Sequence, residues 1–347
     1  MTEYFRPILN TDLSIPDNAQ VMRGTHFWFT HAEKLARNTE PQIVLAKNIP
    51  DNILQNITHE RVNICRLSFD VPRVMGILNV TPDSFSDGGK YSSVETAEVH
   101  LKSMISDGAD IIDIGGESTR PGAVEVEISE EISRVIPIID KMAKKISVPI
   151  SVDTRKSEVA GLAVSNGAVL VNDVSGLTFD PKMSELCVKQ NIPVCIMHSQ
   201  GLPETMQAKP TYQDVCLDIY DFLSEQIEKL VKSGMQRKNI IVDPGIGFGK
   251  TLKHNVDLLR RISLFHGLGV PILIGVSRKK FIKTIAELEE NEDRLSGSLS
   301  VALFARSQGV QIFRVHDVKE TVQAMKLWHS IHSCLLYTSD AADDRYR

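Results

Sequence analysis

The chain has 347 residues, 42% of them hydrophobic, which is enough apolar material for one large α/β barrel or two ordinary domains. The formal net charge is −5 and no run of five lysines and arginines occurs, so the sequence shows no electrostatic footprint for nucleic acid. The five cysteines have neither CxxC nor zinc-ligand spacing, as is typical of reduced thiols. Because no leader pattern and no apolar stretch of about 20 residues occurs, we expect a soluble, cytoplasmic protein that binds no membrane.

The first 70 residues differ from the rest of the chain. They contain an aromatic cluster, HFWFTH (26–31), and no regular alternation of strands and helices. We expect residues 1–70 to form a small α/β appendage on the side of the main domain.

From residue 71 onward, short apolar runs rich in β-branched residues alternate with segments of helical period. Each run ends in a polar or glycine-rich turn. The predicted strands cover residues 74–80, 109–115, 148–153, 169–175, 192–198, 239–245, 271–277 and 311–317. The predicted helices include residues 94–106, 129–145, 156–166, 212–232, 256–265 and 297–307.

This alternation indicates parallel strands that are buried on both faces. Eight strand-helix units match a TIM barrel, whose usual length is about 250 residues. A doubly wound sheet is the alternative, but the glycine fingerprint that usually follows its first strand is missing. We therefore predict an α/β fold, a TIM (β/α)8 barrel over residues 71–331 with a small N-terminal extension. The tail CLLYTSDAADDRYR lies within residues 332–347 and resembles a cloning scar, so we expect it to be non-native or disordered.

Polar residues stand at the ends of the predicted strands, where a purely structural strand would not need them. Each could be an ordinary strand-end or capping residue, since Asn and Asp are common in turns. In a barrel, however, all these positions converge on the C-terminal end, where barrel active sites are built. The residues are Asn79, Asp113, Asp153, Asn172, His198, Asp243, Ser277, Arg314 and His316.

The chemistry of these strand ends predicts two kinds of ligand group. Asp153, Asn172 and Asp243 suit a flat, nitrogen-rich heterocycle, because ionised carboxylates can only accept hydrogen bonds. Cationic and polar groups beyond the last two strands, Lys279 and Arg314 among them, suit a phosphate group. The glycine-rich loops over 81–89 and 115–123 belong to the same end and could close over a ligand.

The stretch DPGIGFGKT (243–251) looks at first like a nucleotide-binding P-loop. That motif requires G-x-x-x-x-G-K-[ST], and Pro244 occupies the position of its first glycine. Proline has no N–H to offer a phosphate, and the neighbouring Asp243 would repel one. We therefore interpret this stretch as the end of the sixth barrel strand, with Asp243 facing the heterocycle.

Seven motifs, in this order, resemble those of the dihydropteroate synthases of folate biosynthesis. They are NVTPDSFSDGG (79–89), DIGGESTRPGA (113–123), VDTRK (152–156), NDVSG (172–176), DPGIGFGK (243–250), GVSRK (275–279) and RVHD (314–317). The resemblance implies a transferase that joins 6-hydroxymethyl-7,8-dihydropterin diphosphate to 4-aminobenzoate, with release of diphosphate. It also implies Mg²⁺ as cofactor, a homodimer and a target of sulfonamides.

The resemblance assigns roles to individual residues. Asp153, Asn172, Asp243 and Lys279 would hold the pterin; Asn79 and Asp87 would bind Mg²⁺; Thr119, Arg314, Val315 and His316 would contact the diphosphate; and Phe85, Arg120, Pro121 and Phe248 would form the aminobenzoate pocket. Asn79, Lys279, Arg314 and His316 are the residues expected to take part in catalysis. His198 is expected to be a structural residue rather than a catalyst.

Departure of diphosphate would leave a cation delocalised into the pterin ring, so the site needs cations on the leaving group and acceptors around the ring. Because an aryl amine is already neutral at pH 7, we expect neither a dedicated general base nor a covalent enzyme intermediate. Two alternatives stay open: a pterin-binding methyltransferase, which has no diphosphate to bind, and a catalytically silent pterin-binding paralogue. The two long loops and the RVH sequence favour the synthase over the methyltransferase. Both loops together with intact Asn79, Asp153, Asp243 and Lys279 argue against the silent paralogue.

Overall fold

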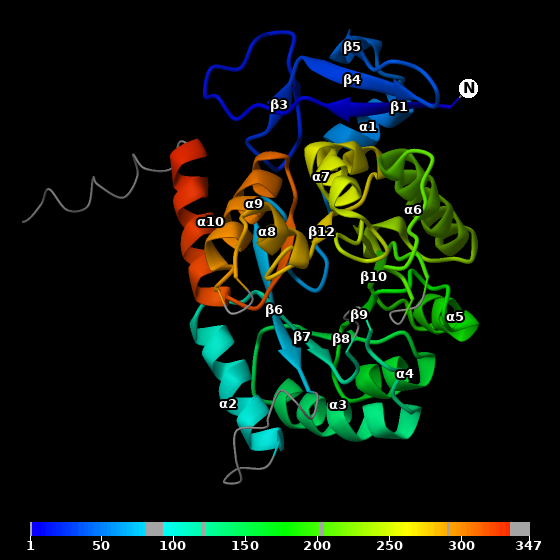
Figure 1. The fold of residues 1–347 in the computed structure, drawn as a ribbon, viewed down its shortest axis with the longest axis vertical. Coiled ribbons are helices and arrows are strands. Elements are labelled where there is room, and N and C mark those ends of the chain that lie inside the picture. The colour runs from blue at the N-terminus through cyan, green and yellow to red at the C-terminus, as the bar shows by residue number, and fades with distance from the viewer. Residues whose placement is uncertain (1, 81–92, 119–121, 202–204, 290–291, 334–347) are drawn as a thin grey trace, which may run out of the picture.

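The computed structural model describes residues 2–80, 93–118, 122–201, 205–289 and 292–333. Its main part is a parallel sheet of eight strands in the order β11-β10-β9-β8-β7-β6-β13-β12, surrounded by helices (Figure 1). In chain order the strands are β6 (Arg73–Asn79), β7 (Ile111–Gly115), β8 (Ile150–Asp153), β9 (Leu170–Asp173), β10 (Val194–Met197), β11 (Ile240–Asp243), β12 (Leu273–Ile274) and β13 (Ile312–Val315). Each lies within or overlaps a strand predicted from the sequence.

The two edge strands of this sheet, β11 and β12, meet and close it. Val242 and Ile272 form a parallel bridge, and the Val242 N–H donates to the Pro271 carbonyl at 3.0 Å. We call this junction the seam. The closed parallel sheet confirms the predicted TIM barrel.

Helices follow the strands along the chain and pack on the outside of the barrel; all but the last, α10, connect one strand to the next. They are α2 (Ser93–Ser106), α3 (Ile128–Ala143), α4 (Ser157–Ser165), α5 (Pro181–Gln190), α6 (Val215–Lys232), α7 (Leu252–Arg260), α8 (Lys280–Ile285), α9 (Leu295–Ser307) and α10 (Val318–His332), with 3-10 turns η3 (Arg237–Asn239) and η4 (Ile262–Leu268). One continuous helix over 256–265 was a wrong prediction. The Thr251 hydroxyl caps the His254 N–H at 3.2 Å, so α7 starts earlier, and η4 replaces its last turns.

Alternation along the strands separates an apolar layer from a polar layer inside the barrel. Met75, Ile111, Leu170, Cys195, Ile241, Leu273 and Ile312 belong to one buried cluster, which Ile64 and Phe69 complete. Side chains two residues apart point to the same side of a strand. Asp113, Asn172, Asp243 and Arg314 therefore face the barrel interior one layer closer to the carboxyl ends of the strands. We call that end the mouth and the opposite end the foot.

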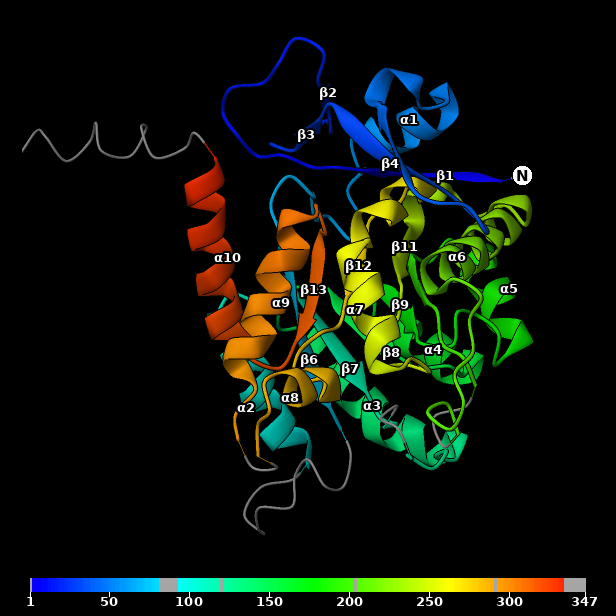
Figure 2. The same ribbon diagram turned by 45° about the horizontal axis from the view of Figure 1, so that its top comes forward.

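The N-terminal segment packs at the foot of the barrel. It contains a sheet of β1 (Glu3–Pro7), β4 (His31–Ala36) and β5 (Gln42–Leu45), the pair β2 (Gln20–Val21) and β3 (Trp28–Phe29), the turn η1 (Ala46–Asn48) and helix α1 (Asp51–Thr58). Figures 1 and 2 show this segment above the barrel, with β6 pointing away from it. Phe5, Phe27, Phe29 and Ile57 form a core of their own, to which Trp328 of α10 contributes. The division at residue 70 stays a prediction.

Among the described residues, no helix combines the length and the apolar character that a membrane span requires. Residues 334–347 of the predicted tail lie outside the described part of the chain.

Candidate active site

The mouth of the barrel gathers polar side chains from strands that are far apart in the sequence. Asp153 at the end of β8, Asn172 in β9 and Asp243 at the end of β11 are each no more than 5% exposed. Arg314 of β13 lies among them with a side chain that is 18% exposed. The structure therefore brings three predicted pterin residues and one predicted diphosphate residue into the same buried layer.

Arg314 holds two carboxylates at once. Its Nε donates to Asp113 Oδ2 at 2.6 Å and its Nη2 donates to Asp153 Oδ2 at 2.7 Å. Asn172 Nδ2 also donates to Asp113 Oδ2, at 2.9 Å. Asp113 thus fixes both Arg314 and Asn172, a positioning role that sequence analysis did not assign. The strand-end pattern marked Asp113 as polar, but the contact joins residues 201 positions apart.

Two buried carboxylate oxygens of this group, Asp113 Oδ1 and Asp153 Oδ1, have no hydrogen-bond partner among the described residues. A buried acceptor without a donor costs about 1–3 kcal/mol. Burial raises the pKa of Asp153 to about 7, although Arg314 acts in the opposite direction. Burial alone would lower the pKa of Arg314, but its two carboxylates raise it above the usual value. The mouth therefore holds more acceptors than its own donors satisfy.

The turn after β11 aims the Asp243 carboxylate. The Gly245 N–H donates to Asp243 Oδ1 at 2.7 Å. Gly245 has φ +72°, and a Cβ at this position would lie 2.0 Å from the His198 carbonyl oxygen, so only glycine fits here. Burial raises the pKa of Asp243 to about 6, opposed by the Gly245 N–H and by Lys279. Gly245 of DPGIGFGK is thus needed for close packing of two backbone segments, not for binding a phosphate.

Lys250, which would be the phosphate-binding lysine of a P-loop, points into the protein. It is 3% exposed, and its Nζ donates to the Phe248 carbonyl at 2.9 Å and to the His198 carbonyl at 3.2 Å. Its Nζ also lies 3.1 Å from His198 Nδ1. Burial lowers the pKa of Lys250 to about 7. Lys250 therefore ties the turn after β11 to the end of β10, a role that the sequence did not reveal, and His198 is part of that packing.

Lys279 and Phe248 meet at the edge of the mouth. The Lys279 Nζ lies 4.1 Å from the centroid of the Phe248 ring, a cation–π contact between a predicted pterin residue and a predicted aminobenzoate residue. Lys279 also lies next to Gly247, where an added Cβ would come within 3.2 Å of its Cδ. The two predicted sub-sites are therefore adjacent.

The end of β13 places His316 beside Ser277. The Ser277 Oγ lies 3.2 Å from His316 Nδ1 and accepts the His316 N–H at 3.2 Å. Val315 differs from Arg314 and His316, because its side chain belongs to the main hydrophobic core between the sheet and the helices. Only the backbone of Val315 can therefore contribute to a site in the mouth.

A buried ion network supports the loop after β7. Glu117 accepts from both Arg155 and Lys156, and Lys156 Nζ also donates to Glu131 Oε2 at 2.7 Å. All four side chains are nearly inaccessible to solvent. The Arg155 guanidinium also lies over the Phe179 ring, 4.2 Å from its centroid. This network was missed by sequence analysis, although Glu117 belongs to the GGES segment and Arg155 and Lys156 to the DTRK segment; Glu131 comes from α3.

Five predicted site residues lie outside the described residues: Phe85, Asp87, Thr119, Arg120 and Pro121. Asn79 is half-buried at the end of β6, where its amide oxygen is a ligand of the kind that Mg²⁺ prefers. Within the described ranges, no cluster of three or more His, Cys, Asp or Glu side chains could hold a metal ion by itself.

Known proteins resemble this chain over most of its length. The family model of the pterin binding enzymes matches residues 75–316. Dihydropteroate synthase of Escherichia coli (strain K12) is 48% identical over 261 residues, which cover 75% of this chain and 92% of that protein. Dihydropteroate synthase of Bacillus subtilis (strain 168) is 48% identical over 254 residues, covering 73% of this chain and 86% of the relative.

Solved structures give the same result. A Xanthomonas albilineans dihydropteroate synthase with 4-aminobenzoic acid has a TM-score of 0.73 and 43% identity, covering 77% of this chain and 95% of its own. The Yersinia pestis enzyme in a sulfonamide drug complex has a TM-score of 0.73 and 45% identity, covering 77% of this chain and 97% of its own. The chain therefore belongs to the pterin binding enzyme family, and within it to the dihydropteroate synthases.

Proposed function

We propose that the mouth of this barrel condenses 6-hydroxymethyl-7,8-dihydropterin diphosphate with 4-aminobenzoate, releasing 7,8-dihydropteroate and diphosphate. The observation that carries this proposal is the excess of buried acceptors at the mouth, above all the unpartnered Asp153 Oδ1. A pterin ring presents several N–H donors on one flat edge, which is the complement that such acceptors need. In relatives of known structure, the Xanthomonas albilineans enzyme occurs with 4-aminobenzoic acid and with 7,8-dihydropteroate.

The proposed pterin site consists of Asp153, Asn172, Asp243 and Lys279. Asn172 uses its Nδ2 on Asp113, which leaves its amide oxygen as an acceptor for a ring N–H. Asp243 keeps Oδ2 for the ligand, because Gly245 engages Oδ1. The acceptors also stabilise positive charge on the ring as the diphosphate leaves.

The leaving diphosphate would lie across the mouth, toward β12 and β13. Arg314 has five N–H donors, and Asp113 and Asp153 engage Nε and Nη2. His316, positioned by Ser277, adds a further donor. Thr119 and the Val315 backbone complete this proposed set, and stabilisation of the departing charge is their common effect.

The second substrate would enter beside Phe248. The Phe248 ring, with the Lys279 ammonium over one face, makes a flat wall next to the pterin site. Phe85, Arg120 and Pro121 are the other residues proposed for this pocket. Exclusion of water here would protect the pterin cation until the neutral amine attacks it.

We propose Mg²⁺ as the cofactor, held by Asn79 and Asp87. When bound, the ion would neutralise negative charge on the diphosphate as it departs. Asn79 supports this proposal through its place at the end of β6, at the same mouth as Arg314.

We also propose a homodimer in the cytoplasm. Phe304 of α9 and Leu327 and Ile331 of α10 are 43%, 64% and 67% exposed, so this side of the barrel offers apolar surface to a second copy. Light scattering of the purified protein tests this proposal; the mass of a single chain at micromolar concentration would contradict it.

The decisive experiment measures diphosphate release from dihydropterin diphosphate with 4-aminobenzoate and Mg²⁺, and identifies the organic product by mass. We expect dihydropteroate and diphosphate in equal amounts. Reactions without 4-aminobenzoate serve as the control for water capture of the cation. Folded protein that binds the dihydropterin but forms no dihydropteroate would contradict the proposal and favour a silent pterin-binding paralogue.

A further inference from the structure

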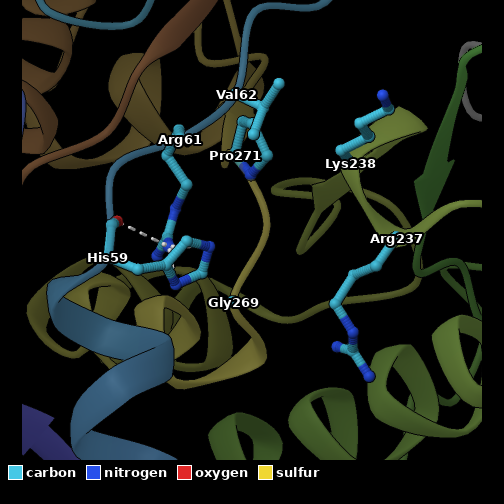
Figure 3. A pocket seen from close by; sticks show the side chains of 7 residues that line it. All are labelled: His59, Arg61, Val62, Arg237, Lys238, Gly269 and Pro271. Atoms are coloured by element: carbon cyan, nitrogen blue, oxygen red, sulfur yellow. Dashed lines mark hydrogen bonds between the residues drawn. The ribbon is translucent and has the colours of Figure 1, made fainter.

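A small cavity lies at the foot of the barrel, remote from the mouth. Its volume is about 100 Å³, and its lining includes His59, Arg61, Arg237, Lys238, Gly269 and Pro271. Figure 3 shows His59 and Arg61 on one side and Arg237 and Lys238 on the other. A cavity needs only about 10–15 Å³ in this measure to hold one water molecule. The space is therefore large enough for a small polyatomic ion.

Arg61 is a buried cation without a counter-charge. Arg61 is only 8% exposed. Its Nη1 donates to the Asn56 carbonyl at 2.8 Å and its Nη2 donates to the His266 carbonyl at 3.2 Å. Its Nε is buried and has no hydrogen-bond partner. Burial lowers the pKa of Arg61 to about 10, and no carboxylate acts against this shift. Because buried charges are normally paired, a missing anion is the simplest complement.

The rest of the lining adds positive charge. Lys238 is exposed at the rim of the cavity and has no ion pair or hydrogen bond within the described residues. Arg237 pairs with Glu228 and donates to the Leu268 carbonyl at 2.9 Å. His59 contributes no charge near neutral pH, because burial lowers its pKa. Among the described residues, neither Arg61 nor Lys238 has a carboxylate partner, and only the Arg61 charge is buried.

We propose that this foot pocket binds a small oxyanion of the phosphate class, either inorganic phosphate or the phosphate group of a small metabolite. Arg61 offers its unpartnered Nε–H, since its Nη groups already donate to backbone oxygens, and the exposed Lys238 side chain can add an ammonium group from the rim. The small volume fits a compact tetrahedral group better than an extended chain. None of the proposed catalytic residues lies in this pocket, so the site is separate from the diphosphate site at the mouth.

The position of the pocket gives the anion a structural consequence. Arg61 belongs to the segment between α1 and β6, Lys238 to the turn before β11, and Pro271 to the segment before β12. Pro271 is also the acceptor at the seam, where its carbonyl receives the Val242 N–H. An anion held here would join the N-terminal segment to both strands of the seam. A ligand that binds only the native state raises stability by mass action.

Calorimetric titration of the full chain with inorganic phosphate, at constant ionic strength, tests the proposal. The variant Lys238→Gln removes one charge of the pocket, and Lys326→Gln is the matched control on the exposed face of α10. Because the mouth also carries cations, His316→Ala identifies any phosphate bound there. We expect Lys238→Gln to weaken the foot-pocket binding step at least about tenfold, as loss of one charge-assisted hydrogen bond does, while Lys326→Gln and His316→Ala retain it.

A thermal shift assay supplies a second measurement. Phosphate should raise Tm in the native chain and not in Arg61→Met, whose lower starting Tm reflects its lost bonds to backbone oxygens. A phosphate monoester such as glycerol phosphate, used in parallel, distinguishes the sources: tighter binding of the ester indicates a metabolite, and tighter binding of phosphate indicates the free ion. Equal responses of Lys238→Gln and Lys326→Gln to both probes, or loss of all binding in His316→Ala, would overturn the proposal.

Discussion

The mouth and the foot of this barrel carry opposite imbalances of buried polar groups. At the mouth, Arg314 and Asn172 satisfy only one oxygen of Asp113, and Asp153 Oδ1 has no donor. At the foot, Arg61 satisfies backbone oxygens but has no carboxylate, and its Nε has no acceptor. Since buried polar groups are normally paired, each imbalance indicates the ligand that would correct it. The mouth lacks donors, such as the N–H groups of a pterin, and the foot lacks an anion.

The largest effect is expected from Arg314→Met. This change leaves Asp113 and Asp153 buried without their shared cation, and breaking a buried pair in this way costs about 3–5 kcal/mol of unfolding free energy. Urea denaturation measures the loss. The control is Arg278→Met, because Arg278 also pairs with an aspartate, Asp317, but has a side chain that is 52% exposed. An exposed pair contributes about 0–1 kcal/mol. Equal losses in the two variants would show that burial at the mouth has no special cost.

The free energy of unfolding that Arg314→Met loses should depend on pH. Burial raises the pKa of Asp153 from 3.8 to about 7, so the native state holds this proton over a range where the unfolded chain has lost it. The stability that comes from this protonation is fully present below the unfolded pKa and is lost as the pH rises through the folded pKa. Without Arg314 the ionised form is less favourable still. We therefore expect the deficit of Arg314→Met to be smaller at about pH 5 than at about pH 8; an equal deficit would argue that Asp153 stays ionised throughout.

Two buried aspartates on different strands separate ligand binding from folding. Asp243 uses one oxygen on Gly245, whereas Asp173 uses Oδ1 on Ser175 and Oδ2 on Leu177. We expect Asp243→Asn to weaken binding of a dihydropterin ligand by about 1.5–3 kcal/mol, the range of a hydrogen bond to a charged group, with little change in Tm. Asp173→Asn should instead lower Tm and leave the affinity for the dihydropterin ligand little changed. Calorimetry with the ligand and a thermal melt provide both readings, and unchanged affinity in Asp243→Asn would remove Asp243 from the pterin site.

The sequence was sufficient to predict the mouth because its information is local. A two-residue alternation relates Ile241 to Asp243 and Ile312 to Arg314, so the strand pattern alone puts the polar residue of each pair into one layer. The hydrogen bonds between these residues could not be predicted, because each side chain has several possible partners on other strands across the barrel. Asp113 shows this: its polarity was visible in the sequence, and its hold on Arg314 was not.

Other features escaped prediction because they depend on distant packing. The sequence placed Lys250 in the motif after the sixth strand without a partner, yet its ammonium group reaches the His198 carbonyl from 52 positions away. Arg61 attracted no prediction, and its partner His266 is 205 positions away. No periodicity encodes such contacts. The fold of the first 70 residues was predicted only as a small α/β appendage for the same reason, since its strands are short and its core includes Trp328 of the last helix.

The smallest effect is expected where the N-terminal segment joins the foot. Ser263 in η4 is fully buried, and its Oγ donates to the Pro7 carbonyl at 3.0 Å, linking β1 to the barrel. Ser263→Ala should lower the unfolding free energy by about 0.5–1.5 kcal/mol, the net contribution of one hydrogen bond. Ser106→Ala is the control, because Ser106 is exposed and bonds only within its own helix. If the foot contributes only stability, diphosphate release at the mouth should be unchanged below the melting range. A loss of activity in Ser263→Ala that exceeds its loss of folded protein would instead mean that the extension shapes the mouth through the barrel wall.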